Sequence, residues 1–219
     1  MLQHVFERAS LAHYLSSVLI ATDDDRIYQE ARNFKAPVRM TRADHPTGTD
    51  RIAEVASADN AEIIVNIQGD EPLIDPNAID AAVLSLLGQP EVPMATLKKR
   101  IEFEPEVANP NVVKVVTNAL GHALYFSRSP IPHLASASNR TTQFKHIGLY
   151  VYRKQFLLQY PSLPVGPLET AERLEQLRAL ENGYRIQVVE TEYESIGVDT
   201  PEDLEKVSSL FIASNLSNG

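Results

Sequence analysis

The sequence contains no cysteine among its 219 residues. Disulfide bonds, thiolate zinc sites, iron–sulfur clusters and a cysteine nucleophile are therefore excluded for this chain. Tryptophan is also absent and aromatic residues make up only 7% of the chain, which argues against a surface that stacks ligands on aromatic rings. Because a chain without cysteine suits a reducing compartment, we expect a cytoplasmic location.

Long hydrophobic runs and an excess of basic residues are missing as well. No apolar run approaches the roughly 18 residues of a membrane span, and residues 1–10 lack the basic and apolar segments of a signal peptide. The chain has 20 Lys and Arg against 29 Asp and Glu, a formal charge of −9. We therefore expect neither a membrane nor a nucleic-acid partner. An anionic ligand would need placed arginines, helix N-termini or a divalent metal.

The remaining composition, 43% apolar and 22% charged, is typical of a soluble globular protein. No linker separates two units, so we expect a single domain over residues 1–219. In the first half, predicted strands alternate with predicted helices, which indicates βαβ units. The second half predicts several strands joined by turns, so we expect an α/β domain with an inserted, partly antiparallel region. The predicted helices are 2–16, 26–34, 50–58, 77–87, 169–181 and one from Pro201, and the predicted strands are 18–21, 38–40, 63–67, 94–97, 112–117, 123–126, 147–152 and 186–189.

The segment Q-G-D-E-P at residues 68–72 directly follows the predicted strand 63–67. Ligands of open α/β sheets bind outside the carboxyl ends of strands. A carboxylate there, such as Asp70, can hold Mg²⁺, which in turn holds phosphates. An ordinary strand-to-loop turn is an equal alternative, because Gly, Asp and Pro are common in turns.

A second carboxylate, Asp199, precedes the last predicted helix. Thr200 can cap that helix and leave Asp199 free. Two carboxylates far apart in sequence that converge on one ion are a usual way to build a Mg²⁺ site. The alternative is that Asp199 only stabilises the positive end of the helix.

Residues 41–51 read T-R-A-D-H-P-T-G-T-D-R. We expect Thr49 to cap the helix 50–58, with Gly48 and Thr49 presenting free backbone N–H groups to a phosphate or a base edge. Arg42 and Arg51 add local positive charge. A capped helix with surface arginines explains the pattern equally well, and the spacing is not that of a P-loop.

Three polar positions share one face of the strand predicted around residues 147–152. His146, Gly148 and Tyr150 alternate with apolar residues, which suits a polar cavity. Arg128 could clamp a carboxylate through two hydrogen bonds. The alternative for His146 is a hydrogen-bonded structural histidine.

The helix predicted over residues 169–181 has a polar face. Glu169, Glu172 and Gln176 share it at helical spacing. A solvated face explains this pattern without any ligand.

Taken together, the motifs resemble those of the 3-deoxy-manno-octulosonate (Kdo) cytidylyltransferases, also called CMP-Kdo synthetases. They occur in family order and extend over nearly the whole chain, which is more specific than any single motif. The matching segments are residues 41–45, 48–51, 65–72, 109–116, 123–128, 146–150, 174–178 and 197–204.

The resemblance implies a Rossmann-like nucleotide-sugar transferase fold. Its sheet would be mixed and mostly parallel, with helices on both faces and an inserted antiparallel region for dimerisation and substrate binding. The implied reaction converts CTP and Kdo to CMP-Kdo and pyrophosphate with Mg²⁺, for lipopolysaccharide core biosynthesis. The family is usually homodimeric, so we expect a homodimer.

The resemblance also implies roles for individual residues. Asp70 and Asp199 would be the Mg²⁺ ligands, and Gln68 would act beside them near the reacting phosphate. The nucleotide-binding residues would be Thr41, Arg42, Ala43, Gly48, Thr49, Asp50 and Arg51. The Kdo-binding residues would be Arg128, His146, Tyr150, Glu172 and Gln176.

One departure from the family concerns its opening strand and its loop A-R-x-x-S-x-R-x-P-x-K, which surrounds the CTP phosphates. Residues 1–9 align with the helix after that loop, so nothing here corresponds to it. We expect Met1 to be an internal methionine of a longer reading frame, a hypothesis that upstream in-frame DNA lacking the loop would contradict. The strand is normally interior, so we expect unpaired sheet groups and little or no catalysis by a chain this short.

Other functions stay open at this stage. One alternative is a related CMP-sugar synthetase, for example for sialic acid. Another is an inactive form that binds ligand or only dimerises. A metal-dependent glycosyltransferase is a third alternative, although such enzymes commonly carry Asp-x-Asp at a strand end. The residues 126–128 together with 146–150 favour Kdo.

Overall fold

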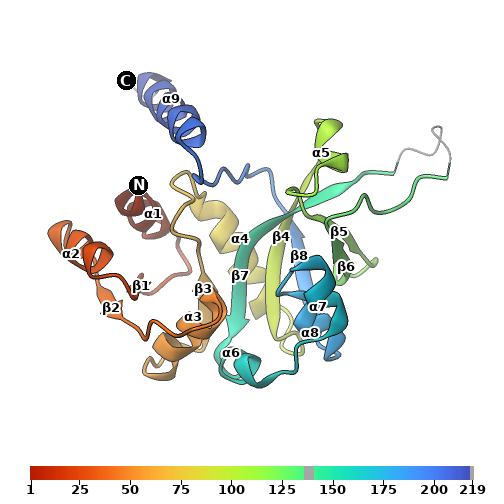
Figure 1. The fold of residues 1–219 in the computed structure, drawn as a ribbon, viewed down its shortest axis with the longest axis horizontal. Helices are drawn as coiled ribbons and strands as arrows, with labels where there is room; N and C mark the ends of the chain where they lie inside the picture. Colours follow the sequence, from red (N-terminus) through yellow and green to blue (C-terminus); the bar gives the residue numbers. More distant parts are fainter. Residues whose placement is uncertain (136–140, 218–219) are drawn as a thin grey trace.

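The structure, a computed structural model, describes residues 1–135 and 141–217 and is built around a six-stranded mixed sheet (Figure 1). The strand order is β6-β5-β7-β4-β8, and β3 pairs with the second half of β7. β7 runs antiparallel to β3, β4 and β5, whereas β8 runs parallel to β4. Strands β3, β4, β5 and β8 therefore point one way, which confirms the predicted mixed sheet. The strands are β3 (Ile63–Asn66), β4 (Met94–Arg100), β5 (Lys114–Thr117), β6 (Ala123–Ser127), β7 (Phe144–Arg153) and β8 (Ile186–Glu190).

A separate parallel pair, β1 (Ile20–Thr22) and β2 (Val38–Met40), lies beside helix α2 (Asp25–Asn33). A cavity of about 420 Å³ lies between β1 and β3. Among the described residues, β1 pairs only with β2 and β3 only with β7, so each has one edge without a strand partner. Unpaired sheet edges of this kind are what we expect from the sequence.

Helices cover both faces of the main sheet, as predicted. α1 (Leu2–Ala9) and α4 (Pro76–Leu87) pack on one face, and α3 (Gly48–Ser57), α6 (Lys154–Gln159) and α8 (Leu177–Glu181) pack on the other. Alternate residues of β7 enter the two apolar cores, because successive side chains of a strand point to opposite faces. The remaining short helical segments are α5 (Pro105–Ala108), η1 (Tyr160–Ser162) and α7 (Pro167–Glu172).

The first helix is shorter than its sequence pattern predicts. The predicted helix 2–16 ends at Ala9 in the structure. The backbone N–H groups of His13 and Tyr14 donate instead to the carboxylate of Asp80 in α4, at 3.0 and 2.9 Å. This long-range contact turns the chain away from the helical path.

Helix α3 begins two residues earlier than predicted. The N-cap is Thr47, whose Oγ1 accepts from the backbone N–H of Asp50 at 3.2 Å. The prediction that Thr49 caps this helix is wrong, because Thr49 lies inside the first turn and is buried. Both threonines could serve as caps, and only the tertiary position of the turn distinguishes them.

The predicted helix 169–181 is two helices, α7 and α8. Arg173 ends α7 in the left-handed conformation, with φ of 53°. This conformation cannot continue a right-handed helix. The prediction that Glu169, Glu172 and Gln176 share one helix face is therefore wrong.

The chain leaves β8 through residues 191–199, called here the connecting segment, and then enters α9 (Pro201–Ser217). Thr200 caps this helix as predicted, and Asp203 completes a reciprocal cap, with bonds of 3.0 and 3.2 Å. α9 stands away from the sheet beside α1 (Figure 1). None of the helices described in the structure is long and apolar enough to cross a membrane.

Candidate functional site

The loop after β3 meets the connecting segment that follows β8. The backbone N–H of Val198 donates to the carbonyl oxygen of Asp70 at 3.0 Å. A Cβ atom built on Gly197 would lie 3.8 Å from Oδ2 of Asp70, so this carboxylate faces the connecting segment. The structure thus brings the chain around Asp199 to the loop that carries Asp70.

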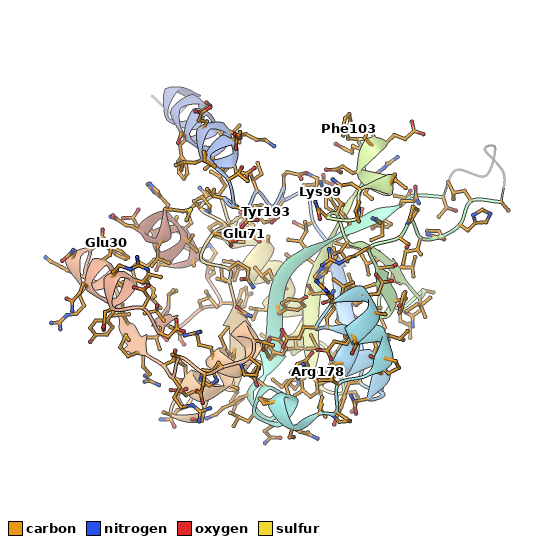
Figure 2. All side chains as sticks on the ribbon, viewed as in Figure 1. Glu30, Glu71, Lys99, Phe103, Arg178 and Tyr193 are labelled. Carbon is orange, nitrogen blue, oxygen red and sulfur yellow. The ribbon has the colours of Figure 1, made fainter. Side chains whose placement is uncertain are left out.

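A buried hydrogen bond joins the same two segments from the inside. Tyr193 Oη donates to Glu71 Oε2 at 2.9 Å, and both residues are only 7% exposed. Figure 2 shows these side chains next to each other at the end of the sheet. Burial raises the pKa of the Glu71 carboxyl, although hydrogen bonds from Ser195 and Tyr193 oppose the rise. The sequence analysis did not predict this pair. The only feature of the sequence that pointed to it is Glu71 itself, a second carboxylate directly after Asp70.

The two exposed or half-buried carboxylates, Asp70 and Asp199, have the chemistry of a magnesium site. Mg²⁺ prefers oxygen ligands and is usually held by one or two carboxylates plus substrate phosphates. Within residues 1–135 and 141–217, no three His, Cys, Asp or Glu side chains form a complete metal cluster. Two carboxylates could hold such an ion together with phosphate oxygens and water.

Two ends of the predicted nucleotide segment are tied together. Arg51 Nη1 donates to Thr41 Oγ1 at 2.7 Å, and Arg51 Nη2 pairs with Asp23 Oδ2 at 2.8 Å. The hydrogen bond from Arg51 lowers the pKa of the Asp23 carboxyl. These bonds close residues 41–51 into a loop at the start of α3.

The cavity between β1 and β3 collects part of the predicted site. Gly48, Arg51 and Gln68 line it, together with apolar residues of α1. A Cβ atom on Gly48 would meet no atom within 4 Å, so the start of α3 is open there. A ligand in this cavity would meet a helix N-terminus and a guanidinium, both suited to an anion.

Several predicted nucleotide residues do not line this cavity. Arg42 turns toward Asp44 and Glu54, at 3.4 and 3.7 Å, and Glu54 also pairs with His45. Asp50 accepts from Thr47 Oγ1 at 2.6 Å. The remaining nucleotide residues outside the lining are Thr41, Ala43 and Thr49.

The predicted polar face of β7 exists. His146, Gly148 and Tyr150 alternate with the buried residues of the opposite face, and the rings of His146 and Tyr150 lie 5.4 Å apart. A Cβ atom on Gly148 would meet nothing within 4 Å. This face is therefore open at Gly148, beside the two polar rings.

His146 is neutral in this environment. Burial lowers the pKa of its imidazole to about 3. Thr96 Oγ1 lies 2.8 Å from His146 Nε2 and within 3.0 Å of the carbonyl oxygens of Ile147 and Leu149. Because the hydroxyl proton goes to a carbonyl, we assign the ring proton to Nε2, which leaves Nδ1 as an acceptor.

Glu172 and Gln176 have different environments. Glu172 accepts from Ser127 Oγ at 2.6 Å and from the backbone N–H of Arg128 at 2.9 Å. Both oxygens of its carboxylate therefore accept hydrogen bonds from the protein. Gln176 is 5% exposed, and its Nε2 has no hydrogen-bond partner within the part of the chain that the structure describes. Buried donors are almost always satisfied, so an unpartnered amide points to a missing ligand.

Arg128 is held by neutral groups. Its guanidinium donates to the carbonyl oxygens of Glu172 and Pro110, at 2.8 and 3.0 Å. Lys114, which is fully buried, donates to the carbonyl oxygen of Arg128 at 2.6 Å. Among the described residues, no carboxylate pairs with this guanidinium, which leaves it suited to bind an anion.

Glu175 is a further residue that sequence reasoning did not single out. Its Oε1 accepts from Thr47 Oγ1 at 3.0 Å, and Thr49 also bonds to its carboxyl. Burial raises the pKa of this carboxyl. Glu175 thus joins the predicted nucleotide loop to the chain that carries Gln176.

Comparisons with known proteins agree over nearly the whole chain. A family model described as cytidylyltransferase matches residues 1–190. A protein named 3-deoxy-manno-octulosonate cytidylyltransferase from Solibacter usitatus (strain Ellin6076) is 71% identical over 99% of this chain and 86% of its own. The protein of the same name from Geobacter sulfurreducens (strain ATCC 51573 / DSM 12127 / PCA) is 58% identical over 94% of this chain and 87% of its own.

Solved structures give the same picture. CMP:2-keto-3-deoxy-manno-octonic acid synthetase complexed with CTP matches with a TM-score of 0.93 and 42% identity, covering 97% of this chain and 88% of that one. 4-diphosphocytidyl-2C-methyl-D-erythritol synthase from Anaerococcus prevotii DSM 20548 matches with a TM-score of 0.62 and 12% identity, over 96% of this chain and 85% of that one. The second likeness concerns the fold alone.

Proposed function

The chain belongs to the cytidylyltransferase family, and on that premise we propose that it transfers the cytidylyl group of CTP to Kdo. The products are CMP-Kdo and pyrophosphate, and CMP-Kdo is the activated sugar for the lipopolysaccharide inner core. The observation that carries this proposal is the high identity, over nearly the whole chain, to proteins named for this reaction. The unpartnered amide and the open polar face of β7 support a sugar site.

In this reaction the anomeric hydroxyl of Kdo attacks the α-phosphate of CTP. A new oxygen–phosphorus bond forms, the bond to the β-phosphate breaks, and pyrophosphate leaves in line. Both substrates are anionic, since Kdo carries a carboxylate. The protein must therefore offset charge repulsion at the point of attack.

We assign this task to Asp70 and Asp199 as ligands of Mg²⁺. When bound, Mg²⁺ would neutralise phosphate charge and align the reacting groups. The contact between Val198 and the carbonyl of Asp70 supports this assignment, because it brings the two carboxylate-bearing segments together. Gln68, at the cavity edge, would contact the groups near the α-phosphate.

The sugar would lie on the polar face of β7. Arg128 would hold the Kdo carboxylate, because its charge has only neutral partners. The Nδ1 atom of His146 would accept from a sugar hydroxyl, and Gln176 Nε2 would donate to one. Tyr150 would close the site from the same strand, and Glu172 would hold the backbone of Arg128 rather than the sugar.

The nucleotide would lie along residues 41–51. Gly48 and Arg51 would face its phosphates from the cavity. Thr41 and Asp50 would keep the loop closed, through Arg51 and Thr47 respectively. Arg42, Ala43 and Thr49 complete the proposed nucleotide-binding residues.

A pyrophosphate-release assay with CTP, Kdo and Mg²⁺ tests this function. Asp70→Asn and Asp199→Asn are each expected to abolish turnover, because each removes a charged metal ligand. Asp25→Asn is the matched control, since Asp25 is an exposed carboxylate on α2.

Near-normal turnover in either site variant would remove that residue from the metal site. Turnover of another sugar acid in place of Kdo, with a substrate panel that includes sialic acid, would replace the proposed substrate.

We also propose a cytoplasmic homodimer. β6 lies at one edge of the described sheet and carries an exposed leucine, Leu124, 60% accessible, and the adjoining turn exposes Leu120, 72% accessible. An apolar sheet edge of this kind suits a second copy of the chain. Light scattering at several concentrations would test the dimer, and a monomer throughout would refute it.

A further inference from the structure

The connecting segment, residues 191–199, contains no helix or strand, yet specific contacts hold it at both ends. At its start, the N–H of Thr191 donates to the carbonyl of Lys98 at 2.9 Å, and Lys99 Nζ donates to the carbonyl of Glu192 at 2.7 Å. Glu194 pairs with Lys145 at 2.5 Å. These bonds fix the first half of the segment to β4 and β7.

Tyr193 turns the other way from Glu194, into the apolar core beneath the loop of Asp70. Its hydroxyl reaches Glu71, and Ser195 bonds to the same carboxylate. One buried carboxylate therefore receives two hydroxyl groups from the connecting segment. Glu71 directly follows Asp70, and Ser195 lies four residues before Asp199.

Few other contacts locate the second half of the segment. Past Ser195, the described link to the opposite loop is the bond from Val198 to the carbonyl of Asp70. Without the bonds to Glu71, that end of the segment would depend on this one backbone bond and on α9. A single exposed backbone bond fixes a loop poorly.

We infer that Tyr193 and Glu71 are positioning residues that set Asp199 against Asp70 for metal binding. The inference rests on the proposed function, because it takes both aspartates as metal ligands. Mg²⁺ requires near-octahedral geometry at about 2.0–2.1 Å, so a small displacement of one carboxylate weakens binding. The tether acts through the aspartates and touches neither metal nor substrate.

The test uses Tyr193→Phe in the full-length protein, with Mn²⁺ as a paramagnetic probe for the Mg²⁺ site. The phenylalanine ring keeps the core contact and removes only the hydroxyl. With CTP present, we expect Mn²⁺ affinity to fall about tenfold by electron paramagnetic resonance of free Mn²⁺. We expect the Mg²⁺ requirement of turnover to rise similarly, with the KM for Kdo unchanged.

Matched variants separate positioning from general damage. Tyr184→Phe removes a hydroxyl that accepts from Gln159 on the far side of the molecule, and it should bind Mn²⁺ as the unaltered protein does. Glu71→Gln keeps an acceptor oxygen for Tyr193, so it should retain more Mn²⁺ affinity than Glu71→Ala. If Tyr193→Phe fails to fold, the comparison of the two Glu71 variants decides.

Two results would overturn the inference. One rejects only the tether, and the other rejects the proposed metal site as well. Unchanged Mn²⁺ affinity in folded Tyr193→Phe, with binding lost in Asp70→Asn, would reject the tether and leave the metal site standing. Unchanged Mn²⁺ affinity in Asp70→Asn would show that the proposed metal site is wrong, and the inference would fall with it.

Discussion

At the scale of single residues, two polar side chains of the proposed sugar site, the buried Gln176 and the half-buried Arg128, matter most. Among residues 1–135 and 141–217, the amide nitrogen of Gln176 has no hydrogen-bond partner, and the guanidinium of Arg128 donates to backbone carbonyls. Neither feature is visible in the sequence, where both residues are ordinary polar positions. The resemblance to the family implied a sugar-binding role for both residues, but the partners of each side chain are defined only by the fold.

Gln176→Leu should separate stability from substrate binding. An unsatisfied buried amide costs about 1–3 kcal/mol, so its removal is expected to raise the free energy of unfolding by about 1 kcal/mol. The KM for Kdo should rise at least tenfold, while the KM for CTP stays the same. Urea unfolding and steady-state kinetics measure the two effects.

The exposed Gln159 offers the control for this variant. Gln159→Leu should change neither KM. A less stable Gln176→Leu protein would mean that the amide is satisfied in solution, and an unchanged KM for Kdo would take Gln176 out of the sugar site.

At the scale of elements, the order of helices and strands could be predicted, but their ends could not always be. The spacing of apolar residues predicts β3, β4, β7 and α4 close to where the structure has them, because these elements bury apolar faces. The ends of α1 and α3 depend on Asp80 and Thr47, partners that only the folded chain brings into place. The break at Arg173 is a backbone conformation that no helical pattern records.

The candidate site divides in the same way. The resemblance to the family joins Asp70 with Asp199, and the structure brings their loops together after β3 and β8, which point the same way in one sheet. Two hydrogen-bonded pairs behind these loops could not be predicted from the sequence. They are Glu71 with Tyr193 and Glu175 with Thr47. Their contacts join segments far apart in sequence, and neither pair forms a short motif.

Arg173→Gly is expected to stabilise the protein. The left-handed conformation at φ of 53° costs a non-glycine residue about 1–2 kcal/mol, part of which is offset by the greater freedom of glycine when unfolded. The expected net gain is about 0.5–1 kcal/mol in urea unfolding.

Arg173→Ala is the comparison that isolates the backbone, because it removes the same side chain and keeps the Cβ atom. The glycine variant should be the more stable of the two. Equal stabilities would indicate that residue 173 is unstrained in solution.

At the scale of the whole molecule, one sheet carries two apolar cores. Leu149 enters the core beneath α1 and α4, and Leu177 enters the core beneath α3 and α6. Both cores rest on β4 and β7, so loss of these shared strands exposes both cores. The described sheet and its two layers should therefore unfold in one cooperative transition.

Leu149→Ala and Leu177→Ala test this coupling. Each residue is almost fully buried, so each change is expected to cost about 2–5 kcal/mol. The midpoint of urea unfolding should fall in both variants with little change in slope, as followed by far-ultraviolet and near-ultraviolet circular dichroism. Two separated transitions in either variant would contradict a single unit.

The bond from Val198 to Asp70 also makes one amide proton a reporter of the entire site. Hydrogen exchange at a backbone amide measures how often its bond opens. The Val198 amide can exchange only when the two aspartate loops move apart, and its partner is a carbonyl of the same residue that is proposed to hold metal. The protection of this single amide therefore registers, in the native protein and without catalysis, how long the two halves of the site stay assembled.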